Sequence, residues 1–267
     1  MYLYLRNHLS IRARLVIIIG LTCSSLLLVF CLPAIPQPLA YHNIADQRTI
    51  LGLPNGLNVL SNLAFFIPGL LGIFILCSQP LPRSFGKPHE KIAFFVLFLG
   101  AILASIGSAY YHLDPNNETL VWDRLPIAVV QGAILCILIA DRVKAEAGLY
   151  LLLPLILLGI IATLYWDYTE HLGRGDLRFY AYTEILPIII ILLLLWLFPA
   201  RYQGQSYVFE AFAFYALGRI GEFFDSWIYK LTAQVISGHT LKHVAMGLGI
   251  YFLVRYMQYR EISLKGP

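Results

Sequence analysis

Three histidines of this chain stand at the ends of apolar segments, where ionisable side chains are costly and usually functional. His239 and His243 open the last apolar segment, and His112 closes an earlier one. Residues at i and i+4 lie on one face of a helix, so the pair can present two ring nitrogens to one ion. Three imidazoles leave a zinc ion with an open fourth position, which is typical of a hydrolase. The spacing therefore predicts a catalytic zinc site.

Two further side chains near His112 fit the same chemistry. Ser108 lies one helical turn before it, and Asp123 follows it after a turn at residues 114–117. A carboxylate such as that of Asp123 can take a proton from an attacking water and deliver it to a leaving amine. A hydroxyl such as that of Ser108 can donate to the oxyanion of a tetrahedral intermediate. We therefore expect Asp123 and Ser108 to be catalytic residues beside the zinc.

The composition indicates that lipid surrounds the elements that hold these residues. Of the 267 residues, 59% are hydrophobic and only 13% are charged, whereas soluble domains carry about 25% charged residues. Several apolar runs reach the roughly 20 residues that cross a bilayer core. The net charge of +4 comes from scattered basic residues without an aromatic-basic patch, which argues against nucleic acid as a partner. The four cysteines lack the spacing of metal ligands.

The predicted fold class is an all-α membrane protein with a seven-transmembrane helical bundle and one additional N-terminal transmembrane helix. The predicted domains are an N-terminal anchor helix and connection over 1–40, a core over 41–260 and a cytoplasmic tail over 261–267. A cleaved signal peptide is the alternative for the first segment. Eight spans are predicted, at 15–33, 57–77, 91–111, 121–140, 149–165, 181–199, 206–222 and 239–257.

The distribution of basic residues predicts the orientation of these spans. With eight spans, one set of basic residues falls on a single side of the membrane. Basic residues are enriched on the cytoplasmic side, so both termini are expected in the cytoplasm. The histidines and Asp123 then lie together at the non-cytoplasmic face. The residues of this set are Arg6, Arg12, Arg14, Arg83, Lys87, Lys91, Arg142, Lys144, Arg201, Arg255, Arg260 and Lys265.

Four short motifs strung along the chain carry a resemblance to a known family. In order, they are Asn58-Val-Leu-Ser61-Asn62, Ser108-Ala-Tyr-Tyr-His112, Trp122-Asp123 and His239-Thr-Leu-Lys-His243. Over residues 43–257 the chain resembles the alkaline ceramidases, which belong to the CREST superfamily of seven-helix membrane zinc hydrolases. The resemblance implies hydrolysis of the amide bond of ceramide or a related sphingolipid to a sphingoid base and a free fatty acid.

The resemblance also implies a role for each candidate residue. Zinc is held by His112, His239 and His243, Asp123 is the acid–base, and Ser108 assists at the oxyanion. The expected partner is a ceramide-like lipid within the membrane, and the oligomeric state is left open.

The chain departs from the family in the segment before its first core helix. Alkaline ceramidases have an acidic, calcium-binding stretch there, ending in a glutamate at the position of Asn55. Here the segment carries one acidic residue, Asp46, and a nearby Arg48. Calcium takes several carboxylate or carbonyl oxygens, so the sequence argues against a full calcium site as a second cofactor. Asp46 is expected to pair with Arg48 or to cap the backbone.

Other polar residues and other functions stay open from sequence. Glu184, Arg219 and Glu222 lie within predicted spans, and we expect them either to line a cavity or to pair with one another. A zinc-containing lipid esterase or phospholipase-type remodelling enzyme is an alternative function, because activated water does not choose between amides and esters. A receptor-like lipid-binding protein with structural zinc is another, although the chain offers no fourth histidine or cysteine to close the site. A transporter would show inverted repeats, and we find none.

Overall fold

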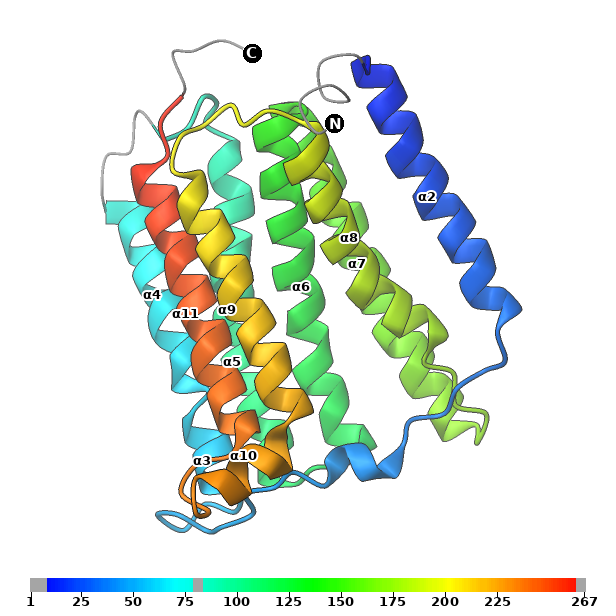
Figure 1. The fold of residues 1–267 in the computed structure, drawn as a ribbon, viewed down its shortest axis with the longest axis vertical. Helices are drawn as coiled ribbons and strands as arrows, with labels where there is room; N and C mark the ends of the chain where they lie inside the picture. Colours follow the sequence, from blue (N-terminus) through cyan, green and yellow to red (C-terminus); the bar gives the residue numbers. More distant parts are fainter. Residues whose placement is uncertain (1–8, 79–83, 263–267) are drawn as a thin grey trace.

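The computed structural model describes residues 9–78 and 84–262, and its helices run up and down along one long axis (Figure 1). Arg6, Arg83, Lys265 and the last part of the predicted tail lie outside the described residues. The elements are α2 (Ile11–Cys31), η1 (Leu39–His42), α3 (Gly56–Leu60), α4 (Leu63–Ser78), α5 (Glu90–Leu113), α6 (Asn117–Arg142), α7 (Ala145–His171), α8 (Arg178–Leu197), α9 (Gln205–Phe223), α10 (Asp225–Leu231) and α11 (Gly238–Tyr259).

Six helical segments of the described chain are long and apolar enough to cross a membrane. They are α2, the segment Gly56–Ser78 that joins α3 and α4, and the helices α5, α6, α7 and α8. Each of the eight predicted spans falls on a helix. However, α9 and α11 fall outside the six because they carry more polar side chains, such as Glu222 on α9 and Lys242 on α11. The all-helical membrane class is confirmed, and membrane crossing by α9 and α11 stays a prediction.

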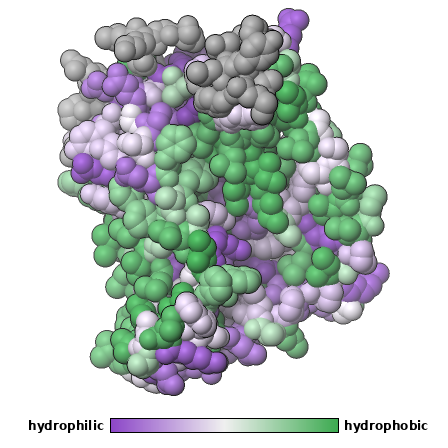
Figure 2. All heavy atoms as spheres, in the orientation of Figure 1, coloured by the Kyte–Doolittle hydropathy of each residue, from purple (hydrophilic) through white to green (hydrophobic). Residues whose placement is uncertain are grey.

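Apolar side chains cover much of the outer surface of the bundle. Figure 2 shows a broad apolar region across the middle of one face, with polar side chains gathered toward the upper and lower ends. Large exposed apolar residues occur along the lipid-facing sides of α4, α7 and α8, among them Phe74, Leu153 and Leu192. Contiguous apolar surface of this extent is a liability in water and is expected for a protein whose solvent is lipid.

The predicted span 57–77 is broken into α3 and α4 by local side-chain hydrogen bonds. The Ser61 hydroxyl donates to the Asn58 carbonyl at 3.1 Å. The Asn62 amide donates to the carbonyls of Asn58 and Val59 at 2.8 and 3.3 Å. Serine and asparagine compete in this way with the backbone bonds of a helix, and they explain the break. The break lies beside the first turns of α11, where the histidine pair begins.

A buried ion cluster closes the opposite end of the bundle. The Arg260 guanidinium lies 2.8 Å from the carboxylates of both Glu90 and Asp141, and all three side chains are at most 1% exposed. The hydroxyls of Tyr202 and Tyr256 donate to Glu90 and Asp141 at 2.6 Å each. These contacts tie the start of α5 to the ends of α6 and α11.

The connection from α2 to α3 crosses the end of the bundle where α5 ends and α11 begins (Figure 1). His42 holds it there, since its two ring nitrogens bond the Tyr111 hydroxyl at 3.0 Å and the Asn117 side chain at 2.9 Å. The Ala45 amide donates to the Asp225 carboxylate at 2.8 Å. The connection therefore forms part of the end that carries the candidate residues.

Candidate metal and hydrolytic site

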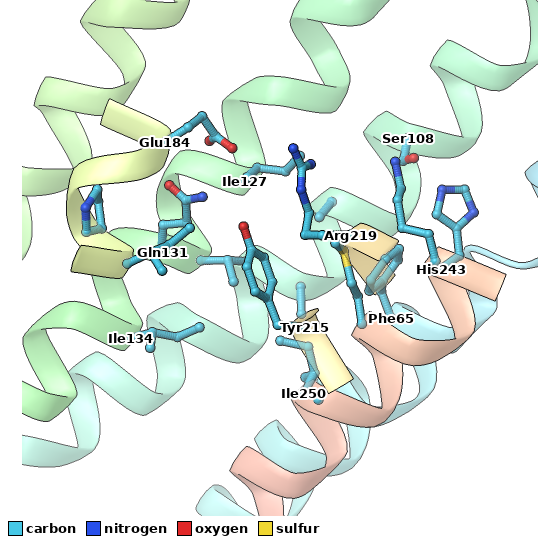
Figure 3. A pocket seen from close by; sticks show the side chains of 18 of the residues that line it. Phe65, Ser108, Ile127, Gln131, Ile134, Glu184, Tyr215, Arg219, His243 and Ile250 are labelled. Carbon is cyan, nitrogen blue, oxygen red and sulfur yellow. The ribbon is translucent and has the colours of Figure 1, made fainter. Parts of the chain in front are cut away.

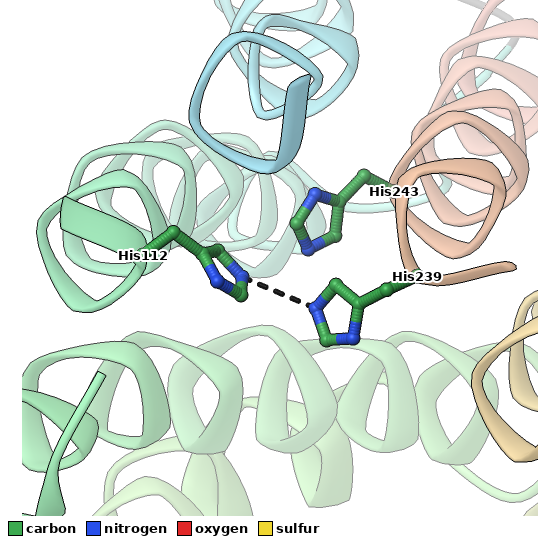
Figure 4. Close-up of side chains that lie close together, drawn as sticks. All are labelled: His112, His239 and His243. Carbon is green, nitrogen blue, oxygen red and sulfur yellow. Dashed lines mark hydrogen bonds between the residues drawn. The ribbon is translucent and has the colours of Figure 1, made fainter. Parts of the chain in front are cut away.

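The three predicted histidine ligands come together in the structure. His112 ends α5, and His239 and His243 occupy the first two turns of α11, so the rings face one another from two helices (Figure 4). One ligand nitrogen from each ring lies within 4.8 Å of the other two, and all three side chains are buried. The Nε2 atoms of His112 and His239 are 3.1 Å apart.

This arrangement fits a zinc ion. Zinc binds imidazole at about 2.0–2.1 Å in tetrahedral geometry, which sets neighbouring nitrogens about 3.4 Å apart. The pair at 3.1 Å is already close to that separation, and no separation exceeds 4.8 Å. Three neutral imidazoles buried together also form a donor set that zinc prefers. Among the residues that the structure describes, these histidines form the one group of three or more such ligands.

A neighbouring serine fixes the ring of His243. The Ser61 hydroxyl has a single proton, which it donates to the Asn58 carbonyl, so it accepts from Nδ1 of His243 at 2.7 Å. With the proton on Nδ1, the lone pair of Nε2 is available to a metal. Support of this kind orients metal-binding histidines in many proteins. Nothing in the sequence around Ser61 indicates this role, because the contact joins residues far apart along the chain.

Several side chains fix the start of α11 and with it the histidine pair. Ser237 caps the helix by accepting from the Thr240 amide at 3.0 Å. Asp225, which begins α10, accepts from the His239 amide at 2.7 Å. A carboxylate at this position also complements the positive end of the helix dipole. The short helix α10 was not predicted, because seven residues next to a more apolar segment give little periodic signal.

Ser108 and Asp123 meet where α5 crosses α6. Both side chains are buried, and the Ser108 hydroxyl lies near enough to the Asp123 carboxylate to interact with it. The crossing is close because Gly107 has no side chain: a Cβ there would lie 2.0 Å from the Trp122 carbonyl oxygen. The turn predicted before Asp123 is a capping box, in which Asn116 accepts from the next turn at 2.9 Å.

A cavity of about 200 Å³ joins this pair to the histidines. Ser108 and Asp123 line it together with His243. In the view of Figure 3, Ser108 and His243 lie at one side of the cavity and Glu184 lies at the other. Most of the remaining lining is apolar and comes from α5, α6, α8, α9 and α11, with Ile250 among the labelled residues. The cavity thus has a mostly apolar wall, with polar groups both beside His243 and on the side of Glu184.

From sequence, the charged residues within the spans were expected either to line a cavity or to pair with one another, and the structure shows both arrangements. Glu184, Arg219 and Glu222 all line the cavity. Glu222 also pairs with Arg219 and with Lys242, at 2.7 Å in each case. Sequence reasoning missed Lys242, although its place between the two histidines was a signal. These pairs explain how charged residues of α9 and α11 are accommodated beside apolar helices.

In the segment from Asp46 to Asn55, polar side chains bond to other groups of the protein. Asp46 is paired with Arg48, whose Nε and Nη2 donate to the carboxylate at 2.8 and 2.7 Å, as the sequence predicted. These hydrogen bonds hold the pKa of the Asp46 carboxyl below its ordinary value. Asn55 has a left-handed backbone with φ of 51°, and its side-chain amide donates to the His112 carbonyl at 2.8 Å. Asn55 thus supports the end of α5.

Comparison with protein families gives a match over most of the chain. A family model described as Ceramidase matches residues 55–267. This range begins at Asn55, holds α3 to α11 with every candidate residue, and leaves out α2 and most of the connection that follows it. No curated protein matches the chain.

Proposed function

Since the chain belongs to the ceramidase family, we propose that it is an integral-membrane, zinc-dependent amidase. Its substrate is ceramide or a related sphingolipid, and its products are a sphingoid base and a free fatty acid. The observation that carries this proposal is the meeting of three buried imidazoles, one of which, His243, lines a largely apolar cavity together with Asp123 and Ser108.

His112, His239 and His243 would hold the zinc, and Ser61 keeps the ring of His243 in the orientation that binding needs. A zinc ion with three imidazole ligands supplies a Lewis acid and makes water nucleophilic near neutral pH. No fourth histidine or cysteine joins the group in the part of the chain that the structure describes, which favours an open catalytic site over a closed structural one.

The protons of the reaction are assigned to Asp123. Its carboxylate accepts a proton from the attacking water and then donates it to the nitrogen of the leaving sphingoid base. The hydroxyl of Ser108 lies beside that carboxylate, and both residues line the same cavity. When the amide carbonyl is attacked, the same hydroxyl is available to stabilise negative charge on the carbonyl oxygen. Both side chains are buried, where such interactions are stronger than in water.

The shape of the cavity supports a lipid amide as substrate. Its mostly apolar wall suits a hydrocarbon chain, and the side that carries His243, Ser108 and Asp123 presents polar groups to the amide. Pockets for small ligands are commonly apolar with a few polar groups that fix the orientation. The amide would therefore stop at the level of the histidines, with apolar tails deeper in the bundle.

The proposal includes the topology predicted from sequence. We infer that α9 and α11 also cross the membrane, since Glu222 and Lys242 face the cavity as a pair and avoid lipid. Residues 41–260 then form a seven-helix core, and 1–40 carry the anchor helix. Basic residues cluster where α2 starts and α11 ends, so this end is assigned to the cytoplasm and the histidines to the opposite face. A reporter fused after Pro267 should report cytoplasm.

The proposal is tested with purified protein and a panel of ceramides, phytoceramides and glycerolipids, with and without a chelator. We expect chelator-sensitive release of fatty acid from the amides, and cleavage of glycerolipids alone would replace the amidase by an esterase. Asp123→Asn should abolish hydrolysis and keep about one zinc per chain. His112→Ala should lose the zinc, whereas the exposed His171→Ala is the matched control and should keep it. Stoichiometric zinc in His112→Ala would refute the three-histidine site.

A further inference from the structure

The residue after Asp123 has a setting that the proposed chemistry does not use. Arg124 is 5% exposed and lines the same cavity. Its guanidinium lies 4.0 Å from the centroid of the Trp166 ring and 4.1 Å from that of the Tyr180 ring. The two rings are tilted by 46° to each other and flank the guanidinium on two sides. Arginine makes favourable contacts with aromatic faces while its N–H donors remain available. The rings therefore restrict the position of the guanidinium.

A chain of hydrogen bonds fixes the remaining freedom of that side chain. Nη2 of Arg124 donates to the side-chain oxygen of Gln37 at 2.8 Å. The backbone amide of Gln37 donates to the Glu170 carboxylate at 2.6 Å, and the Trp166 ring nitrogen donates to the same carboxylate at 3.2 Å. Gln37 is buried and belongs to the connection between α2 and α3. That part of the connection precedes residues 55–267, which match the family.

One donor of Arg124 is left over. Within the described residues, its Nη1 is buried and has no hydrogen-bond acceptor. A buried donor without a partner is costly, and it is more costly on a charged group. An oxygen of a ligand in the cavity would remove this penalty, and it would do so next to Asp123, where the proposed reaction takes place.

We propose that Arg124 binds a hydroxyl oxygen on the headgroup side of the lipid amide, and that Gln37 positions it for this contact. This inference rests on the proposed function and adds a subsite to it. Asp123 and Arg124 are consecutive on α6, so the scissile amide and the headgroup oxygen are read by neighbouring residues. The substrate specificity of the site then depends in part on Gln37, which lies in the connection between α2 and α3 and precedes the residues that match the family.

A hydroxyl is the group that such a donor discriminates best. A site built to hydrogen-bond a substrate hydroxyl rejects the analogue that lacks it, because a buried polar group is then left unpaired. A hydrogen bond to a charged donor corresponds to a preference of roughly 10- to 100-fold. The anchor of this donor is unusually firm, since two rings and one amide hold it, so little order is lost when the ligand binds.

The test compares two lipid amides of equal chain length, a ceramide and its 1-deoxy analogue, which lacks the primary hydroxyl. In the wild-type protein we expect kcat/KM for the ceramide to exceed that for the analogue by about 10- to 100-fold. Arg124→Met and Arg124→Lys should bring this ratio toward one, and Gln37→Met should lower it in part. Arg174→Met removes an exposed arginine near the same end of the bundle and should leave the ratio unchanged.

Two results would overturn the inference. One is a wild-type ratio near one, and the other is an Arg124 variant that loses activity on both lipids while the ratio stays high. The stabilisation that each lipid gives in thermal unfolding supplies a second measurement, which does not need turnover. If neither lipid is hydrolysed but the ceramide stabilises the wild type more than the analogue, and Arg124→Met removes this difference, the subsite stands and the proposed hydrolysis fails.

Discussion

The close crossing of α5 and α6 gives the sharpest prediction about the catalytic pair. In Gly107→Ala the new methyl group would lie 2.0 Å from the Trp122 carbonyl oxygen, whereas ordinary contacts begin at 3.4 Å. The two helices must therefore separate locally by about 1.4 Å, since a backbone carbonyl cannot rotate away from the methyl group. Ser108 and Asp123 follow these two residues directly, so the shift changes the distance between their side chains.

We expect Gly107→Ala to lose both stability and activity. Overpacking of this kind typically costs about 1–3 kcal/mol of folding free energy. A displacement of about 1 Å at a catalytic group can lower the rate by about 100-fold. Thermal unfolding in detergent measures the first effect, and fatty-acid release from ceramide measures the second. The zinc content of the same sample shows whether the loss of activity arises from loss of the metal.

Gly100→Ala is the matched control on the same helix. There a new methyl group would meet side-chain carbons of Val129 and Val130 at 3.0 and 3.1 Å and the backbone nitrogen of Val130 at 3.3 Å. These contacts need a shift of only a few tenths of an ångström, and alanine favours a helix by up to about 1 kcal/mol over glycine. We expect near wild-type stability and activity. If Gly107→Ala behaves like Gly100→Ala, the close crossing is refuted as the feature that sets the geometry of the catalytic pair.

Three other predictions concern the supports of the site and of the fold. Ser61→Ala removes the acceptor of His243 Nδ1–H and should lower zinc affinity by about 10- to 100-fold, measured by chelator competition, with the fold retained. Arg260→Met leaves two buried carboxylates unpaired at the opposite end and should cost about 3–5 kcal/mol, seen as a lower Tm with little change in metal binding. Asp46 has a lowered pKa, so its pairing stabilises the fold above the ordinary value of 3.8, and this contribution is lost as the pH falls below that value. Arg48→Met should lower Tm at pH 6 and should make Tm fall less than that of the wild type between pH 5 and pH 3.

The elements that sequence predicted best are those with a strong and continuous signal. Each expected span coincides with a helix, because about 20 apolar residues in a row are difficult to accommodate otherwise. The boundary inside residues 57–77 was missed, since it depends on hydrogen bonds from Ser61 and Asn62 to nearby carbonyls. The hydropathy of α9 and α11 is a weaker indication that they cross the membrane, because both helices carry charged residues. Glu222 and Lys242 pair with each other beside the cavity instead of meeting lipid.

The sequence predicted which three histidines come together and missed the residues that support them. His239 and His243 are visible in a single helix because their spacing alone places them on one face. Gly107 and Gln37 have no local signature, because their roles depend on contacts with Trp122 and Arg124 on α6. A contact between residues far apart along the chain cannot be read from either residue separately.

The supports differ from the ligands in one further respect, which bears on specificity. The histidines, Ser108 and Asp123 lie within the range that matches the family, and the chemistry assigned to them would be common to its members. Gln37 lies before that range, yet it holds Arg124 from the connection that crosses the end of the bundle. If the connection sets the position of Arg124, replacing residues 32–54 by the corresponding connection of another family member should change which headgroup is preferred. The zinc content should not change. A general loss of zinc in such a chimera would instead show that the connection supports the metal site itself.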